Sequence, residues 1–412
     1  MKRTAVFLTL LVLVGLLSGC GEQAEPETES LAGIMETEAS VHSTEEISGE
    51  DAMLEGSLVS EGNNYRLQKV LNKISSGEEV TVGFIGGSIT EGYNAKGVGC
   101  YAELVTRYLD EIYSDGSGKV SCLNAGLSGT PSMLGLIRAD ADLLEKEPDL
   151  IFIEFAVNDA QSFTDKQAYE ALIRKCLLQE NEPAVVLLYS VTSNGYTCQN
   201  DMALTGFYYD LPGVSVRDAI MPAIQSGSMT WADYSNDDVH PHSRGHQFYC
   251  RLIAHLIDTL ASQPADPVYE VPTACKFSRD WSEMKEYDGR NLTVTEQGDF
   301  IQTAAHPRFS NGFSYRGESS GEHRGLTFTV TASTVFLVYK ASNSGTYGTA
   351  EVLVNGEVAA HLTGYDPNGW NNPVTQLILS QKESAPYEIT IRMQPGDEDK
   401  CFDLLAVGIV DN

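Results

Sequence analysis

The sequence predicts a parallel α/β domain followed by an antiparallel β-sandwich. Up to about residue 261, short continuous apolar segments alternate with amphipathic, helix-like segments. This alternation is typical of a parallel sheet with helices on both faces. Beyond residue 275 the apolar residues recur at every second position, as in antiparallel strands that bury one face. At 412 residues the chain is long enough for both units.

The elements of the first domain can be placed in order. A last helix is expected over residues 243–261, because its apolar residues fall on one stripe. The segment "SQPADPVYEVP" that follows contains three prolines, so the domain boundary is placed after residue 263. The predicted strands cover 79–86, 119–126, 149–159 and 184–190. The other helix-like segments are at 101–113, 132–146 and 166–180.

The second domain is predicted to be a jelly-roll-like accessory sandwich over residues 264–412. Asn355-Gly356 lies between two alternating segments and predicts a tight hairpin, since a type I′ turn needs positive φ at both central residues. The strand-like segments cover 325–332, 334–342, 349–362, 386–393 and 402–410.

The first twenty residues have the form of an export signal. Lys2 and Arg3 precede an apolar stretch over residues 5–17, and small residues lead to Cys20. The segment "LSGC" resembles the lipobox of bacterial lipoproteins, in which the cysteine is lipidated. An ordinary signal peptide or an uncleaved anchor are the alternatives, but the apolar stretch is shorter than the ~20 residues of a membrane span. We expect a lipid anchor at Cys20 that holds the protein in the cell envelope, outside the cytoplasmic membrane.

Residues 21–62 contain twelve Asp or Glu and no Lys or Arg. Such a composition buries too little apolar surface to offset chain entropy, so a disordered acidic tether is predicted, with the first domain over 63–263. The net charge is −30 and no basic stripe is visible, which argues against a nucleic-acid partner. Membrane contact is expected through the anchor only, and the oligomeric state is left open.

Seven cysteines follow Cys20, and none forms a CxxC pair, so a metal cluster is not expected. Export permits disulfides, but an odd number leaves at least one thiol unpaired and the connectivity stays open. The seven are at positions 100, 122, 176, 198, 250, 275 and 401.

The segment "VTVGFIGGSITEGYN", residues 80–94, combines a buried strand with a glycine-rich turn around Ser88. It is not a P-loop, because Tyr93 follows the last glycine, and its adjacent glycines do not fit the G-x-G-x-x-G of dinucleotide-binding folds. It is not a G-x-S-x-G elbow either, because position 90 is Thr90. Ser88 nevertheless lies just past the carboxyl end of a strand, where open α/β sheets bind ligands. Taken alone, a serine in such a turn is more often a turn or N-cap residue.

Three further segments would lie near Ser88. They are "NAGLSGTPS" at 124–132, "FAVND" at 155–159 and "NDDVHPHSRGH" at 236–246, each at a strand end or helix entry. Together and in this order, the four segments resemble the SGNH/GDSL hydrolases, esterases and deacylases with a flavodoxin-like three-layer α/β fold. The resemblance covers roughly residues 78–262.

The resemblance implies that Ser88 is the nucleophile and that Asp237 and His240 complete a catalytic triad. It also implies an oxyanion hole formed by the backbone amide of Ser88, by Gly129 and by the Asn158 carboxamide. A serine hydroxyl needs a base to take its proton, and the carboxylate of Asp237 fixes the tautomer of that base. No cofactor is expected.

Two positions depart from the family pattern. Gly87 stands where the family usually has Asp, and Ala156 stands where its third segment usually has Gly. Neither position supplies a catalytic group, so altered loop packing is expected rather than lost chemistry. Asp159 is expected to brace its own loop.

Alternatives remain for the acid and the base. His242 and His246 lie close to His240 in sequence and are candidate bases or metal ligands, and Asp238 could replace Asp237. We favour His240 because it alone has the D-x-x-H-P arrangement. Zinc binding by the three histidines is the less favoured alternative, because no carboxylate set is evident beside them.

The expected function is that of an extracellular serine esterase that removes O-acetyl groups from an acetylated oligo- or polysaccharide, since the two-domain arrangement resembles bacterial carbohydrate esterases. The alternatives are a lipid or thioester acylhydrolase of the same superfamily and a non-catalytic glycan-binding lipoprotein. Candidate substrate contacts are Tyr93 beside the serine, Trp231 before the acid, and Trp370 in a polar loop of the sandwich, where an indole could stack on a sugar or anchor its own loop.

Overall fold

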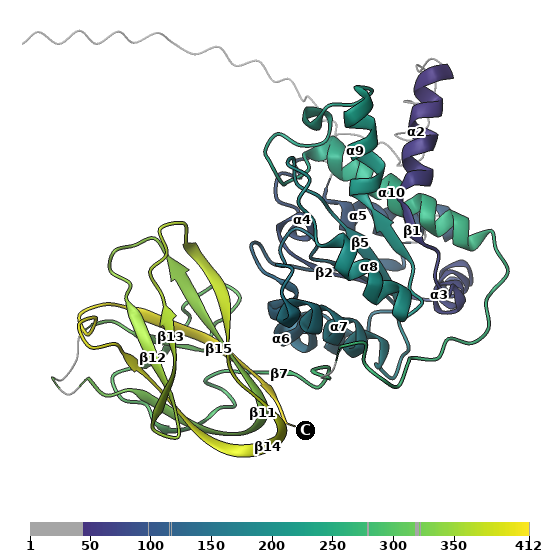
Figure 1. The fold of residues 1–412 in the computed structure, drawn as a ribbon. Coiled ribbons are helices and arrows are strands. Elements are labelled where there is room, and N and C mark those ends of the chain that lie inside the picture. Colours follow the sequence, from purple (N-terminus) through teal and green to yellow (C-terminus); the bar gives the residue numbers. More distant parts are fainter. Residues whose placement is uncertain are drawn as a thin grey trace, which may run out of the picture.

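The computed structural model describes residues 44–97, 99–114, 116, 118–277, 280–317, 321 and 323–411. The predicted signal segment, Cys20 and the N-terminal part of the predicted tether lie outside these residues. Two units follow one another along the chain, an α/β domain and an all-β domain (Figure 1). No helix in the described ranges is both long enough and apolar enough to cross a bilayer.

The α/β domain is built on a six-stranded sheet with the order β1-β6-β5-β4-β2-β3. Strands β2 to β6 are parallel, and β1 pairs antiparallel with β6 at one edge. In chain order the parallel strands follow the flavodoxin-like 2-1-3-4-5 arrangement, which confirms the predicted fold class. The strands are β1 (Leu58–Ser60), β2 (Val80–Gly86), β3 (Val120–Gly126), β4 (Leu150–Glu154), β5 (Ala184–Tyr189) and β6 (Gly213–Ser215).

Helices cover both faces of this sheet, as the continuous apolar strands require. One core lies under α3 (Tyr65–Ser75), α5 (Tyr101–Tyr113), α9 (Val216–Ser226) and α10 (Ser243–Ala261). The other lies under α6 (Ser132–Asp142), α7 (Phe163–Leu177) and α8 (Gln199–Tyr208) (Figure 1). The bounds of α10 are those predicted, whereas β6, α8 and α9 were not predicted. Short helices are α4 (Ser88–Glu91), η1 (Leu144–Lys146) and η2 (Trp231–Asp233).

The predicted tether is wrong in its C-terminal part. Residues Thr44–Ser57 form helix α2, which packs against α9, and Leu58 of β1 pairs with Val214 of β6. Met53, Leu54 and Leu58 pack against the core. The acidic composition of the segment hid this short apolar group, which is enough to dock a helix onto a domain that already exists.

The strands described in the second domain pair antiparallel, and the longest of them, β11 and β14, pair along most of their length. The predicted hairpin is confirmed, because Asn355 and Gly356 have φ of 52° and 85° and connect β12 to β13. Strand β11 is continuous where two segments were predicted, with an irregularity between Ala332 and Thr334. The strands are β7 (Lys285–Tyr287), β8 (Thr293–Glu296), β9 (Ile301–Thr303), β10 (Gly312–Tyr315), β11 (Leu326–Ser342), β12 (Thr349–Val354), β13 (Glu357–Thr363), β14 (Trp370–Met393) and β15 (Phe402–Val410).

The two domains share a packed seam. The backbone of Gly408 in β15 lies so close to α6 that an added Cβ would be 2.7 Å from the Ile137 side chain. Arg308 of the sandwich forms ion pairs with Asp142 of α6, at 2.6 Å, and with Glu286 of β7, at 2.8 Å. The half-buried guanidinium therefore joins the domains where water screens it less than at an open surface.

Hydrogen bonds at Tyr269, Lys276 and Phe277 hold the linker between the domains. The buried carboxylate of Glu170 in α7 accepts hydrogen bonds from the backbone N–H groups of Lys276 and Phe277. The hydroxyl of Tyr269 donates to the carbonyl of Tyr209 at 2.6 Å. These bonds fix the linker on the surface of the first domain, so the sandwich occupies a defined position beside it.

Candidate active site

Ser88 is the first residue of α4 and directly follows β2 through Gly87. Its Oγ lies 2.8 Å from Nε2 of His240, and Nδ1 of His240 lies 3.0 Å from Oδ2 of Asp237. The structure thus brings these three side chains together, although Asp237 and His240 lie 149 and 152 positions after Ser88 in the sequence. The distances allow a proton to pass from the serine to the imidazole.

Backbone N–H groups of the loop before α10 hold the Asp237 carboxylate in place. Its Oδ1 accepts the backbone N–H groups of Val239 at 2.8 Å and of His240 at 2.6 Å. Partial burial raises the pKa of Asp237, but these hydrogen bonds and the contact with His240 outweigh burial and lower the pKa overall. The carboxylate therefore stays charged and can fix the imidazole tautomer.

Asn158 lies in the turn that follows β4, the strand next to β2 in the sheet. Its carboxamide rests against the backbone of Gly87, where an added Cβ would lie 2.3 Å from Oδ1. A side chain at position 87 would displace the amide from its position here. The conformation around Ser88 and the placement of Asn158 therefore depend on each other.

Gly129 lies in the loop after β3 and has φ of 68°, a left-handed conformation that favours glycine. An added Cβ would also lie only 2.7 Å from the indole of Trp370. The loop is tied to the Ser88 segment, because Leu127 N–H donates to the Gly86 carbonyl and Ser128 donates to the Glu91 carboxylate. The two residues that precede Gly129 are thus tied to the segment of Ser88.

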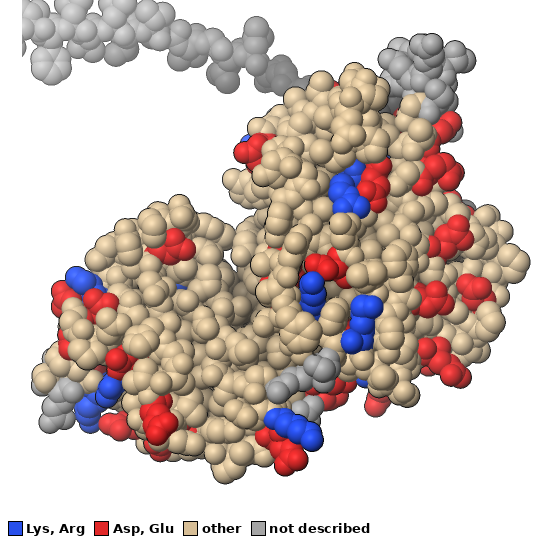
Figure 2. Space-filling view, in the orientation of Figure 1, with Lys and Arg blue, Asp and Glu red and all other residues tan. Residues whose placement is uncertain are grey.

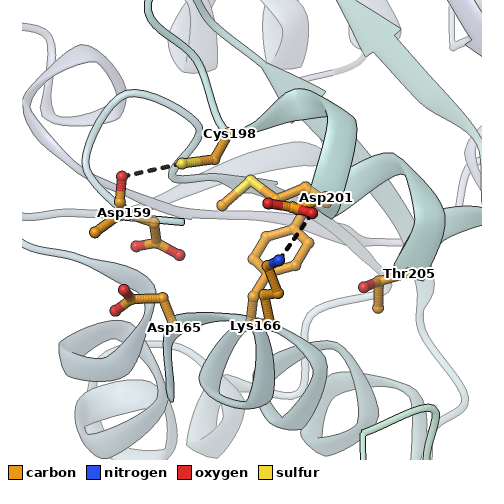
Figure 3. Close-up of a pocket in the computed structure, with 9 residues that line it drawn as sticks. Asp159, Asp165, Lys166, Cys198, Asp201 and Thr205 are labelled. Atoms are coloured by element: carbon orange, nitrogen blue, oxygen red, sulfur yellow. Dashed lines mark hydrogen bonds and ion pairs between the residues drawn. The ribbon is translucent and has the colours of Figure 1, made fainter. Parts of the chain in front are cut away.

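Asp159 braces the loop of Gly129 rather than only its own. The buried carboxylate accepts the backbone N–H of Ser132 at 2.7 Å and the Ser132 hydroxyl at 2.6 Å. Burial raises the pKa of Asp159 to about 8. On its other side, the Asp159 carbonyl accepts the Cys198 thiol (Figure 3). The cavity drawn there measures about 10 Å³, room for roughly one water molecule, and is too small for a substrate.

The neighbouring histidines and acid have other partners. His246 is buried, and its ring contacts the N–H of Tyr101 and the carbonyl of Tyr93, while burial lowers its pKa to about 4. His242 caps α10 by accepting the Gly245 N–H, and Asp238 accepts the Ser193 hydroxyl. Within the described ranges no group of three or more His, Cys, Asp or Glu is arranged to hold a metal ion. The geometry therefore favours Asp237 and His240 over the alternatives.

The three candidate aromatic contacts differ in position. The exposed ring of Tyr93 lies 4.4 Å from the His240 ring, centroid to centroid. The indole N–H of Trp231 donates to the Asp237 carbonyl at 2.6 Å, so Trp231 supports the acid loop. Trp370, at 54% exposure, lies over Gly129.

A cavity of about 590 Å³ opens beside the indole of Trp370, between the two domains. The first domain contributes Glu91 and Ser128 to its wall, and the sandwich contributes His306 and Arg308. Figure 2 shows the surface hollowed between the two domains, with acidic and basic side chains mixed on the face in view. The cavity therefore lies between the loop that precedes Gly129 and the sandwich.

Seven free cysteines are described, and none is paired in a disulfide. The site also contains residues that the sequence did not reveal. Glu91 and Ser132 hold the Gly129 loop, and Asn94 contacts Asp237. Glu91 and Ser132 belong to the quoted segments, but their partners lie 37 and 27 positions away, so spacing alone carries no signal for them.

Glu154 at the end of β4 is fully buried, and burial raises its pKa to about 7 although the Ser190 hydroxyl and the Ala156 N–H lie near enough to lower it. Neither of its oxygens makes a hydrogen bond of ordinary geometry within the described residues. The folded chain therefore holds this proton more tightly than the unfolded chain, and the stability that this confers is present below about pH 4.5 and is lost as pH rises through about 7.

We expect the melting temperature of the Glu154→Gln variant to change less than that of the wild type between pH 5 and pH 8. Each kcal/mol of lost stability corresponds to roughly 2–4 °C. Other titrating groups, Asp159 included, are common to both proteins and cancel in the comparison. Parallel melting curves of the two proteins across this pH range would contradict the expectation.

Comparison with known proteins agrees with this geometry. Residues 84–248 match the model of the GDSL-like lipase/acylhydrolase family. This match covers most of the α/β domain. The chain is therefore an enzyme, a carboxylic ester hydrolase, and the matched range begins in β2 of the GDSL-like domain and ends in α10.

Solved structures extend the similarity to the second domain. A two-domain esterase active on acetylated mannans is 26% identical, with a TM-score of 0.77 over 87% of this chain and 99% of that chain. The same description applies to a structure co-crystallised with mannopentaose, also 26% identical, with a TM-score of 0.76 over 87% of this chain and 98% of that chain. A search of curated protein sequences gave no match. The GDSL-like domain and its sandwich therefore form a known two-domain arrangement.

Proposed function

We propose that this enzyme removes O-acetyl groups from carbohydrate through an acetyl-enzyme intermediate on Ser88. The observation that carries the proposal is the hydrogen-bond chain from Ser88 through His240 to Asp237, set beside Asn158 and Gly129 in a GDSL-like domain. The carbohydrate part rests on the two-domain relative active on acetylated mannans.

The proposed reaction has two steps. His240 Nε2 takes the Ser88 proton while Oγ attacks the acetyl carbonyl carbon, and the resulting oxyanion is stabilised by the amides of Ser88 and Gly129 and the carboxamide of Asn158. The imidazolium then protonates the sugar oxygen, the C–O bond of the ester breaks, and the sugar leaves. Water, deprotonated by His240, attacks the acetyl-enzyme, and acetate leaves as the proton returns to Ser88.

The open cavity supports a bulky alcohol group. It measures about 590 Å³ and leads from the Gly129 loop to the sandwich, with the exposed indole of Trp370 on its wall. An exposed indole beside a cavity lined partly by polar and charged side chains is suited to stacking on a sugar ring. The sandwich thus acts, in this proposal, as a wall of the substrate site.

The test compares acetate release from acetylated mannan, acetylated xylan and simple esters of short and long acyl chains. We expect acetyl esters of the glycans to be preferred and Ser88→Ala to release none. Trp370→Ala should raise KM for the glycans, by about tenfold, and leave small acetyl esters unaffected. Phe207→Ala is the matched control, because Phe207 is equally exposed, at 54%, on helix α8. Faster cleavage of long acyl chains would overturn the carbohydrate assignment.

We propose a lipid anchor at Cys20 and a position outside the cytoplasmic membrane. The support is the sequence of the first twenty residues, with its short apolar stretch and the "LSGC" segment. Cys20→Ala should move the protein from the membrane fraction to the soluble fraction of expressing bacteria. Unchanged membrane association of the variant would contradict lipidation at this cysteine.

A further inference from the structure

The segment after α4 connects the nucleophile to the loop of the acid and base. Tyr93 N–H donates to the Ser88 carbonyl at 3.0 Å, which fixes the beginning of the segment. At its other end Lys96 N–H donates to the Ser243 hydroxyl at 3.1 Å, and that hydroxyl donates back to the Lys96 carbonyl at 2.6 Å. The segment is therefore tied to both halves of the site.

Asn94 lies in the middle of this segment. Its Nδ2 donates to Oδ2 of Asp237 at 2.9 Å, and the same oxygen lies 3.0 Å from His240 Nδ1. Asn94 has φ of 69°, a left-handed conformation that asparagine adopts more readily than most residues. The backbone conformation thus directs this side chain toward the acid.

The contact completes the hydrogen bonding of the carboxylate. Oδ1 of Asp237 already accepts two backbone N–H groups, from Val239 and His240. Oδ2 accepts from the imidazole and from Asn94. A carboxylate has about four acceptor positions, so these four donors occupy most of its hydrogen-bonding capacity, and the Ser235 hydroxyl is a longer contact, 3.5 Å from Oδ1. Without Asn94, Oδ2 of Asp237 would keep the imidazole as a donor but lose its second hydrogen bond.

We propose that Asn94 is a positioning residue of the hydrolytic site: its carboxamide fixes the Asp237 carboxylate against His240 and ties the orientation of that pair to the Ser88 segment. The inference rests on the proposed function, because it assigns Asn94 a role only if these three residues carry the reaction. Asn94 acts through Asp237.

Asn94→Asp gives the sharpest test. Aspartate has the same shape and tolerates the left-handed backbone, but it replaces the donor by a second carboxylate. The added negative charge stabilises the imidazolium, so the acid limb of the kcat/KM profile should move to higher pH by about 1 unit. We expect kcat to fall by about tenfold or more, with KM little changed, because a hydrogen bond to a charged group is lost.

Asn94→Gly removes the donor without adding charge, and glycine accepts the same backbone conformation. It should lower kcat as well, but with a smaller displacement of the acid limb. The contrast between the two variants separates the hydrogen bond from the charge.

The other titratable groups near the pair are unchanged by these substitutions. His246 stays neutral over the acid limb, since burial lowers its pKa to about 4. The groups are Tyr93 and Lys96 on the same segment, Asp233 and Asp238 on the acid loop, and His242, Arg244 and His246 at the start of α10. A displaced limb can therefore be assigned to position 94.

Asn355→Asp is the matched control, because Asn355 has a similar backbone, with φ of 52°, in the β12–β13 turn of the other domain. It should keep the wild-type rate and pH profile. The inference is overturned if folded Asn94→Asp keeps the wild-type kcat and acid limb. It is also overturned if both Asn94 variants only melt earlier and lose activity without any difference in pH profile. Full activity of Ser88→Ala would instead overturn the proposed function.

Discussion

Ser88→Ala should lower kcat by roughly 10⁴- to 10⁶-fold while leaving the melting temperature close to that of the wild type. The Oγ of Ser88 is 2.8 Å from His240 and the residue is 7% exposed, so the methyl group of alanine fits the space that it leaves. The measurement is steady-state hydrolysis of a small acetyl ester, followed by acetate release.

Ser88 and His240 act together in one proton transfer, so the reductions in kcat caused by substituting each of them should not add. The double variant Ser88→Ala, His240→Ala should be about as slow as either single variant. Mass spectrometry of the wild type quenched during turnover should show one added acetyl group, absent from Ser88→Ala. Ser226→Ala, at an exposed position of α9, serves as the control and should keep full activity. A wild-type rate in Ser88→Ala would exclude the proposed nucleophile.

Asn158→Ala should lower kcat by roughly 10²- to 10³-fold, because one donor to the developing oxyanion is lost. KM for a small acetyl ester should change little, since the contact strengthens in the transition state. Asn181→Ala is the control, because Asn181 also holds a loop, through the Pro148 carbonyl, but lies away from Ser88 in the chain.

Gly87→Ala tests the same donor by steric means. The added methyl group would lie 2.3 Å from Oδ1 of Asn158 and must push the carboxamide away. We expect kcat to fall by at least about tenfold although no polar group has been removed. If Gly87→Ala and Asn158→Ala both kept the wild-type rate, Asn158 would not be an oxyanion donor.

The fold could be predicted from the sequence wherever the apolar pattern is strong. The strands β2, β4 and β5 are largely apolar, buried segments, and α10 has a clean stripe of buried residues. The strand β6 has three residues and β1 follows an acidic helix, so neither has a pattern of its own. Their pairing depends on tertiary contacts that a single sequence does not display.

The candidate site could be predicted from the sequence for a different reason. Ser88, Asn158 and His240 each follow a strand or precede a helix, and parallel strands bring such positions to one edge of the sheet. The contacts that support these residues could not be predicted. The hydrogen bond from Asn94 to Asp237, for example, joins residues that are 143 positions apart. The packing of Gly87 on Asn158 was likewise hidden, since a close approach of backbone to side chain leaves no periodic pattern.

The contact between Gly129 and Trp370 limits how freely the two halves of this gene can be exchanged. The backbone of Gly129, which is proposed to bind the oxyanion, packs against Trp370 of the other domain, 241 residues later in the sequence. A sandwich from a different protein without an aromatic residue at the position of Trp370, the first residue of β14, would lack this wall of the proposed glycan site. The unit of inheritance for the proposed glycan site is therefore the whole chain from β2 to β14, and recombination at the linker would separate its two walls.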